Sequence, residues 1–463
     1  MRPRWLALTT ACVLGVSVLA ACSSSGHATS ASSTTEAAAP STTVAAPTTL
    51  PDTPAGAQAR WLLAALGRLP ILDADVHAHF DTAFLAQVSP GELNQALRSA
   101  AGAKLTSINV NQPTGLVARV TIGGRTQLRV DLSVDARGLI RGLLLRPIAK
   151  LPPAPATWPK VDAALRSVAP KVRLFVGAVT NGTCRPIHAI DPDTPAPLGS
   201  AFKLYVLDAL GRGVASHKVS WDQQLTISAG LKSLPSGVLQ AEPDGTRLSV
   251  RDVASKMISV SDNTAADLLI HLLGRSSVEA ALGASGMTDP ARDLPFLTTR
   301  ELFALKLDQW PTLASRYAAT DTAGRRRLLA DTIDPAGLPA ATPWTTSRDI
   351  DTIEWFASAQ DICRAYASLD ALARRPGLAP IAGVFALNDG GLSLDPAQWQ
   401  TTWFKGGSEP GVLTLNYLAT TRTGHTYVVS ALAENPSEPI NESNASLVMA
   451  SAIKGAFALA ARP

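Results

Sequence analysis

The chain has 463 residues, of which 46% are hydrophobic and 17% charged, and a formal net charge of +4 at pH 7. This length is too great for one small core, so we expect at least two domains. The small net charge, and basic clusters without interleaved aromatic residues, argue against a nucleic-acid surface. The sequence also lacks a glycine-rich phosphate loop and a cysteine–histidine zinc spacing, so we expect no cofactor and no metal.

The first residues predict export and a lipid anchor. Arg2 and Arg4 precede an apolar run over 5–21, which has the length of a signal-peptide core and is short for a membrane span. The run ends in a motif like the bacterial lipobox, which makes 1–21 a lipoprotein signal peptide and Cys22 the lipidated residue. An ordinary secretory signal with a chance cysteine is the alternative. We therefore expect the protein on the extracytoplasmic face of the cell membrane, held by its N-terminal lipid.

A stalk and a small domain are expected next. Residues 22–55 are rich in Ser, Thr, Ala and Pro, carry almost no charge and predict a disordered stalk. Residues 56–150 predict an α+β domain, because helical runs are followed by four strand-like runs. His77 and His79 have no third ligand at a useful spacing, so we interpret them as solvated loop residues, and a proline-rich linker is expected over 151–164. The expected helices are 58–66, 82–87 and 90–101, and the expected strands are 104–111, 115–122, 126–131 and 140–147.

The last part of the chain, 165–463, mixes strand and helix patterns. It opens with a strand that alternates around Gly177, and a long segment near 310–346 is expected to enlarge its helical part. The expected strands are 172–179, 187–190, 413–418 and 427–432, and a helix over 445–460 closes the chain.

Ser200 and Lys203 form the most informative local pattern. Three residues is about one helical turn, and an apolar helix-forming run begins just after Ser200, so both side chains are expected on one face at a helix N-terminus. A serine hydroxyl needs an adjacent base to become a nucleophile, and a lysine whose pKa is lowered by burial can be that base. The spacing alone is common: Ser451 and Lys454 repeat it near the C-terminus, where we interpret it as a helix face.

Two further motifs follow in chain order. Ser261-Asp262-Asn263 lies at a break between two helical runs, where residues of these types prefer to cap helices. A simple helix cap is the alternative interpretation of this motif taken alone. Lys405-Gly406-Gly407 precedes a strand-like run, and glycines in a strand allow a substrate to approach the backbone closely.

Together the three motifs resemble those of the penicillin-recognising serine hydrolases, the class A β-lactamases and penicillin-binding proteins, with their S-x-x-K, S-D-N and K-T-G elements. The resemblance covers about 165–463 and is nearest to actinobacterial β-lactamase-like lipoproteins related to the serine hydrolase of clavulanic acid biosynthesis. It implies a β-lactamase/transpeptidase-like domain, an antiparallel sheet flanked by helices plus an all-helical subdomain. For 56–150 it implies a cone-like α+β domain of the cystatin or NTF2-like type, as in ketosteroid isomerase.

The resemblance also implies catalytic roles. Ser200 would attack a carbonyl carbon and Lys203 would take its proton. Ser261 would relay a proton to the leaving nitrogen, and Lys405 would keep the local potential positive. The backbone N–H groups of Ser200 and Ser408 would form the oxyanion hole.

Substrate binding would involve Asn263, Gly407 and Ser408, with the Asn263 amide holding substrate or the lysine. The chain departs from the K-T-G element at Gly406, so the hydroxyl that usually meets the substrate carboxylate is missing there. The residues that could compensate are Ser408, Ser437, Thr421 and Arg422.

A base for deacylation is harder to find. No E-x-x-L-N segment is present, and Glu354 is the one nearby glutamate that could activate the deacylating water. Without such a base the acyl-enzyme would form but hydrolyse slowly. Cys184 and Cys363 remain after export; in an oxidising compartment they either form a disulfide or stay as two buried thiols.

Three functions compete at this stage. The first is a serine hydrolase, β-lactamase-like, acting on small-molecule β-lactams or esters at the cell envelope. The second is a penicillin-binding-protein-like D,D-peptidase acting on peptidoglycan. The third is a non-catalytic envelope lipoprotein that uses the fold for binding, which the presence of all three motifs argues against.

Overall fold

The computed structural model describes residues 49–462 apart from 87, 113, 125, 136, 149–150 and 340–343. The predicted signal peptide, Cys22 and most of the predicted stalk lie outside the described residues. Nothing in the structure therefore tests the predicted lipid anchor.

The N-terminal part is an α+β domain built around a four-stranded antiparallel sheet of order β1-β2-β3-β4. Side chains from α1 and from alternating positions of the strands, such as Leu62, Leu66, Val120 and Val130, form its core. The strands predicted over 115–122 and 140–147 are confirmed at their predicted ends. The elements are α1 (Pro54–Leu66), α2 (Asp73–His79), α3 (Thr82–Leu85), α4 (Pro90–Leu97), η1 (Arg98–Ala100), β1 (Lys104–Gln112), β2 (Gly115–Ile122), β3 (Thr126–Val134) and β4 (Ile140–Pro147).

The loop predicted around His77 and His79 is wrong, because both lie in α2. Asp73 and Asp75 occupy the first turn of this helix and the histidines its last turn, an order that suits the helix dipole. The His79 ring stacks on Trp61 with 3.8 Å between ring centroids. The helix has only one buried residue and so shows little apolar periodicity in the sequence.

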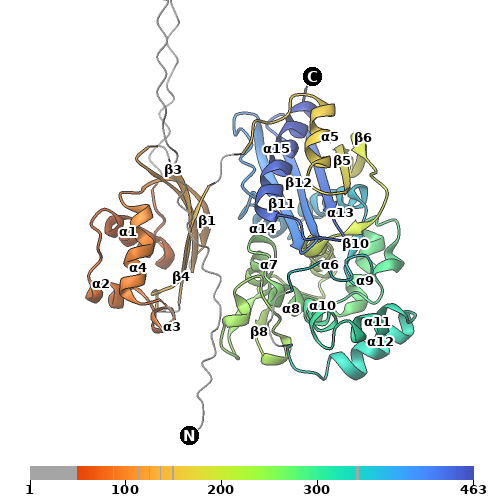
Figure 1. The fold of residues 1–463 in the computed structure, drawn as a ribbon, viewed down its shortest axis with the longest axis horizontal. Coiled ribbons are helices and arrows are strands. Elements are labelled where there is room, and N and C mark those ends of the chain that lie inside the picture. Colours follow the sequence, from red (N-terminus) through yellow and green to blue (C-terminus); the bar gives the residue numbers. More distant parts are fainter. Residues whose placement is uncertain are drawn as a thin grey trace, which may run out of the picture. The chain divides into compact units, whose positions relative to one another are not determined.

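The C-terminal part contains a five-stranded antiparallel sheet of order β11-β12-β13-β5-β6 (Figure 1). One face packs on α5 and α15, the other on α6 and α13 (Figure 1). The elements are α5 (Trp158–Arg166), β5 (Lys171–Thr180), β6 (Thr183–Ile190), α6 (Lys203–Ala215), α13 (Ala359–Ala373), β11 (Trp399–Glu409), β12 (Val412–Thr421), β13 (Thr426–Glu434) and α15 (Glu442–Ala460).

Coverage of both faces changes two expectations. The strand predicted to alternate around Gly177 is instead buried at every position from 172 to 177, because Leu174 and Phe175 enter cores on opposite faces. The helix α5 begins at Trp158, inside the predicted linker, and buries Val161. Among the described residues one helix, α15, is long and apolar enough to cross a membrane, but it serves as a core helix of this sheet.

A largely helical subdomain lies between β6 and β11. The expectation that it is all-helical is wrong in one respect, because it also contains the two-stranded sheet β8-β9. Its helices pack in the same core as α6 and α13. The helices α11 and α12 fall within the segment near 310–346 that was expected to enlarge it. The remaining elements are β7 (Ala196–Pro197), η2 (Gly199–Phe202), β8 (Gln224–Thr226), η3 (Ala229–Leu231), η4 (Leu239–Ala241), β9 (Arg247–Ser249), α7 (Val250–Ser259), α8 (Asn263–Leu273), α9 (Arg275–Ala284), η5 (Pro290–Asp293), α10 (Thr299–Leu307), α11 (Thr312–Ala318), α12 (Thr322–Leu328), η6 (Leu329–Ile333), β10 (Phe356–Ala357) and α14 (Pro380–Phe385).

A disulfide joins Cys184 in β6 to Cys363 in α13, across 179 residues of sequence. It ties the edge strand of the sheet to the helix beneath it. Of the two alternatives left open by the sequence, the structure has the paired one.

In exported protein we expect both cysteines to resist alkylation until a reductant is added, as read from peptide masses. Replacing Cys184 and Cys363 together by alanine is expected to lower the free energy of unfolding by about 2–5 kcal/mol, because the unfolded chain is no longer cross-linked. Two alkylated cysteines in the unreduced sample would contradict the pairing.

Candidate active site

Ser200 and Lys203 lie together, as their spacing predicts, but in different local structure. Ser200 belongs to the 3₁₀ turn η2 and Lys203 begins α6, so the serine precedes the α-helix by one turn rather than starting it. In a 3₁₀ turn, residues three apart eclipse one another. Lys203 Nζ consequently lies 3.0 Å from Ser200 Oγ.

Lys203 is fully buried and surrounded by acceptors. Its Nζ lies 2.6 Å from the Ser261 carbonyl, 3.2 Å from Ser261 Oγ and 2.6 Å from Asn263 Oδ1. Burial lowers the pKa of Lys203 to about 7, and the carboxylates of Asp262 and Asp267 only partly oppose this effect. A fraction of the lysine is therefore neutral at neutral pH and able to accept the Ser200 proton.

We expect the rate of acylation to rise with pH and to reach half of its plateau near pH 7, because only neutral Lys203 can accept the proton. The measurement is the second-order rate of labelling by a fluorescent penicillin between about pH 5 and about pH 9. A rate that does not change over this range would contradict the role of Lys203.

Ser261, Asp262 and Asn263 fall at the predicted break, between α7 and α8. The Asp262 side chain caps α8 by accepting from Ala265 N at 2.8 Å. Ser261 has a positive φ of 57°, which turns the chain so that both its carbonyl and its hydroxyl face Lys203. The motif is thus a helix cap and a set of site residues at once.

Lys405 enters the site from β11. Its Nζ lies 3.0 Å from Ser261 Oγ, so one serine hydroxyl contacts two lysines. Burial and the nearby Lys203 ammonium hold the pKa of Lys405 well below its usual range. Asn416 on β12 fixes the strand by donating to the Lys405 carbonyl at 3.1 Å.

The nucleophile turn and the end of β11 meet backbone to backbone. A methyl group at Gly407 would lie within 2.5 Å of Ser200 N, and one at Gly199 within 2.8 Å of Ser408 N. Only glycine at both positions permits this approach. The N–H groups of Ser200 and Ser408, the predicted oxyanion hole, therefore lie on adjoining segments.

We expect Gly407→Ala to slow acylation on the order of 10²-fold, because the added methyl group forces the two segments apart and misplaces an oxyanion donor. The matched control is Gly230→Ala, where the added methyl group meets no atom within 4 Å. Labelling rates of the two folded variants, compared with wild type, give the result. Equal rates for all three proteins would contradict the assigned hole.

The residues proposed to replace the missing K-T-G hydroxyl lie in different parts of the C-terminal domain. Ser408 Oγ donates to Glu442 Oε1 at 3.0 Å, at the start of α15. Thr421 and Arg422 lie at and beyond the last residue of β12, whereas Ser408 pairs with its first residues. Ser437 follows β13 in the loop before α15. The Glu442 carboxylate beside Ser408 does not favour a substrate carboxylate there.

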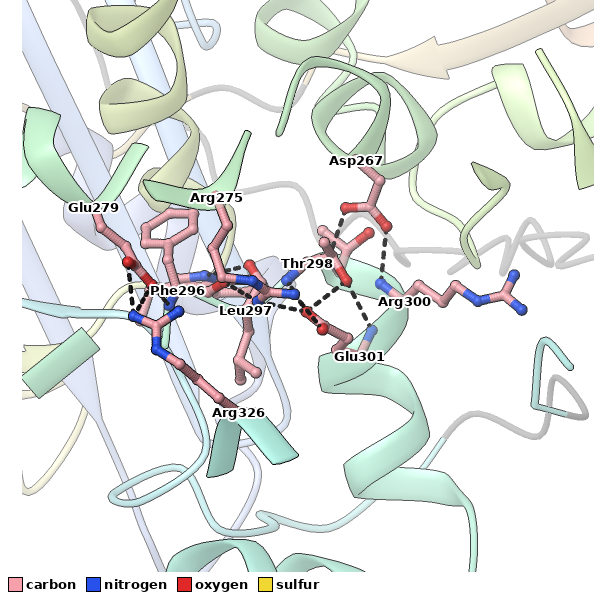
Figure 2. Close-up of polar contacts among 11 residues, drawn as sticks. Asp267, Arg275, Glu279, Phe296, Leu297, Thr298, Arg300, Glu301 and Arg326 are labelled. Carbon is pink, nitrogen blue, oxygen red and sulfur yellow. Dashed lines mark hydrogen bonds and ion pairs between the residues drawn. The ribbon is translucent and has the colours of Figure 1, made fainter. Parts of the chain in front are cut away.

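A polar network joins α8 to the start of α10, where Asp267 faces Arg300 (Figure 2). One helical turn beyond Asn263 in α8, the Asp267 carboxylate accepts from Thr299 N at 2.7 Å and Arg300 N at 2.9 Å, at the start of α10. Thr299 Oγ1 also donates to the Asn263 carbonyl at 3.4 Å. Burial raises the pKa of Asp267 to about 7. No sequence motif indicates Asp267, because its partners lie more than thirty residues away in the chain.

Glu354, the candidate deacylation base, lies two residues before the start of β10 and is buried. Its Oε2 accepts from Gly199 N at 3.2 Å and from Trp355 N at 2.8 Å. Within the described ranges, no hydrogen bond joins a carboxylate to Ser200 or Lys203. The role of Glu354 as a base stays a prediction without a supporting contact.

Comparison with known proteins agrees with this reading of the fold. Residues 158–331 match the beta-lactamase enzyme family, and residues 50–140 match the family described as ORF 12 gene product N-terminal. The chain is 33% identical to Beta-lactamase AST-1 of Nocardia asteroides over 168 residues, 36% of this chain and 47% of that relative, so the match spans about half of the relative's length. These matches support a β-lactamase-like fold for the C-terminal part.

Solved structures are similar at lower identity. They include a beta-lactamase from Sphaerobacter thermophilus, with a TM-score of 0.47, 19% identity and coverage of 66% of this chain and 99% of that chain. PBP-A has a TM-score of 0.45 and 15% identity, covering 67% of this chain and 98% of its own. The cone-like shape of the N-terminal domain and the lipoprotein type stay predictions.

Proposed function

We propose that this protein is a serine hydrolase that forms an acyl-enzyme through Ser200 and acts on small esters and β-lactams. The observation that carries the proposal is the position of the buried Lys203 amine, 3.0 Å from Ser200 Oγ and 3.2 Å from Ser261 Oγ. A base between a nucleophile and a second hydroxyl is the arrangement that acyl transfer needs.

The geometry supports a sequence of proton transfers. Neutral Lys203 takes the Ser200 proton as Oγ attacks the substrate carbonyl, and the N–H groups of Ser200 and Ser408 stabilise the oxyanion. Ser261, in contact with Lys203 and Lys405, passes a proton to the leaving nitrogen or oxygen. Water then hydrolyses the acyl-enzyme and Ser200 recovers its proton.

Glu442 bears on the choice of substrate. Its carboxylate accepts from Ser408 Oγ, on the segment that carries an oxyanion donor. A negative charge at this place disfavours the carboxylate of a penicillin relative to a neutral ester. Uncharged esters are therefore the preferred substrate class.

A D,D-peptidase acting on peptidoglycan is the second candidate. It is favoured by the missing contact between a carboxylate and Ser200 or Lys203 among the described residues, because a penicillin-binding protein holds its penicilloyl group for a long time. Colour change of nitrocefin, release of D-alanine from a stem peptide, and hydrolysis of a neutral phenyl ester separate the candidates.

The first experiment is a mass-spectrometric screen for a covalent adduct after incubation with benzylpenicillin and with simple esters. An adduct on the peptide that contains Ser200 supports the proposal, and its absence with every probe contradicts it. We further propose that the protein acts at the cell envelope through a lipid on Cys22. Partition of the full-length protein into detergent, lost in Cys22→Ala, tests the anchor.

A further inference from the structure

A second group of ionisable side chains lies beneath the nucleophile turn. Glu354 precedes β10, Glu409 ends β11 and Lys306 lies near the end of α10, and all three side chains are buried. None of them belongs to the three sequence motifs. They connect the inserted helical segment to both halves of the predicted oxyanion hole.

The contacts of this group are specific. Lys306 Nζ donates to Glu409 Oε1 at 2.5 Å, and Glu354 Oε2 accepts from the N–H of Gly199. The carboxyl groups of Glu354 and Glu409 are close enough to influence each other's ionisation. Glu409 Oε2 is nevertheless a buried atom without a donor when both carboxyl groups are ionised.

Charge balance also indicates that one of these two carboxyl groups carries a proton. One lysine cannot neutralise two adjacent buried carboxylates, and like charges at this separation cannot both be retained away from water. Burial and the neighbouring Glu409 carboxylate raise the pKa of Glu354 well above its ordinary value. Other titratable groups face Glu354 across a small cavity that it also lines, namely Arg292, Asp293, Tyr317 and Arg325.

We propose that Glu354 and Glu409 share one proton, and that this pair, neutralised by Lys306, positions the nucleophile turn against the end of β11. The shared proton gives Glu409 Oε2 its missing donor. The other Glu354 oxygen remains free to hold Gly199 N–H beside Ser200. Glu354 is then a positioning residue, and at neutral pH the pair has no spare negative charge with which to activate water.

The proposal rests in part on the proposed function, because its kinetic readout is acylation of Ser200. The other two measurements, stability against pH and infrared absorption, do not depend on the proposed function. The folded chain keeps the shared proton at pH values at which the unfolded chain has released it, so the free energy of unfolding falls as pH rises between these two limits. Glutamine at 354 cannot titrate but preserves both contacts, since its oxygen accepts from Gly199 and its nitrogen donates to Glu409.

The experiment compares wild type with Glu354→Gln, Glu354→Leu and, as a matched control, Glu438→Gln, which alters an exposed glutamate. Three quantities are measured on the purified chain. They are the rate of labelling by a fluorescent penicillin at neutral pH, the melting temperature against pH, and the infrared carbonyl band of buried protonated carboxylic acids.

We expect Glu354→Gln to label within about threefold of wild type, to lose part of the infrared band and to have a flatter dependence of melting temperature on pH. Glu354→Leu leaves Gly199 N–H and Glu409 Oε2 without partners and is expected to label at least about tenfold more slowly, or to fold poorly. Glu438→Gln is expected to match wild type in all three.

Two results would overturn the proposal. One is an infrared band and a pH dependence of stability that are unchanged in Glu354→Gln, which means that no proton is shared. The other is labelling of Glu354→Gln as slow as that of Glu354→Leu, which means that an ionised Glu354 is required. If wild type is not labelled at all, the proposed function fails, while the infrared and stability measurements still decide the shared proton.

Discussion

Ser200→Ala is expected to abolish covalent labelling by a fluorescent penicillin and by ester probes. Alanine lacks the oxygen that attacks the carbonyl, and no water held in its place can leave a covalent adduct on the protein. Lys203 keeps its other acceptors in the variant, the Ser261 carbonyl and hydroxyl and Asn263 Oδ1, so the site is expected to stay assembled. Labelling is read by in-gel fluorescence and by intact mass.

Ser451→Ala is the matched control, because Ser451 and Lys454 have the same spacing as Ser200 and Lys203. The Ser451 hydroxyl donates to the carbonyls of Pro152 and Pro153, and Lys454 Nζ donates to the Ser393 carbonyl at 2.9 Å. Neither contacts a member of the second or third motif. Ser451→Ala should label like wild type, whereas an adduct that survives in Ser200→Ala would place the nucleophile elsewhere.

The parts of the site that the sequence predicted are those whose chemistry depends on short spacing. Ser200 and Lys203 are three residues apart, and Asp262 caps the helix that begins with the next residue, so local rules were sufficient. Even so, the nucleophile lies in a 3₁₀ turn rather than at an α-helix start. Gly199, with a φ of +50°, turns the chain there, and its role depends on contact with β11 more than two hundred residues away.

The parts that the sequence did not predict depend on distant partners. Asp267 was missed because it holds the start of α10, and Glu409 because its partner Lys306 in α10 and its neighbour Glu354 lie far from it in the chain. The motifs that lie close to Asp267 and Glu409 in the sequence do not indicate buried carboxylates. A buried carboxylate has no sequence periodicity of its own, since its place is set by the group that pairs with it.

In the fold, too, the features set by local sequence were predicted and those set by distant partners were not. The strands β2 and β4 were predicted to the residue. The strand β5 was expected to alternate and does not, because helices cover both faces of its sheet. The coverage of both faces depends on the positions of α5, α13 and α15, which are set by tertiary packing.

Turnover of penicillins is expected to begin with a burst and to continue at a slow steady rate. Acylation has its base in Lys203, whereas deacylation lacks a carboxylate in contact with Ser200 or Lys203 among the described residues. Loss of a general base for the water slows that step by about 10²–10⁴-fold. Rapid quenching followed by intact mass is expected to find most of the enzyme acylated during the steady state.

Small esters are expected to turn over faster than penicillins, because a small acyl group leaves bulk water room to enter. Glu354→Gln is expected to change the steady-state rate little with either substrate, since Glu354 Oε2 already accepts from Gly199 N and Trp355 N. If that substitution instead traps the acyl-enzyme and abolishes turnover, Glu354 is the base. The chain would then be a true β-lactamase whose catalytic carboxylate comes from a rearranged loop, and acylation would cease to be the faster step.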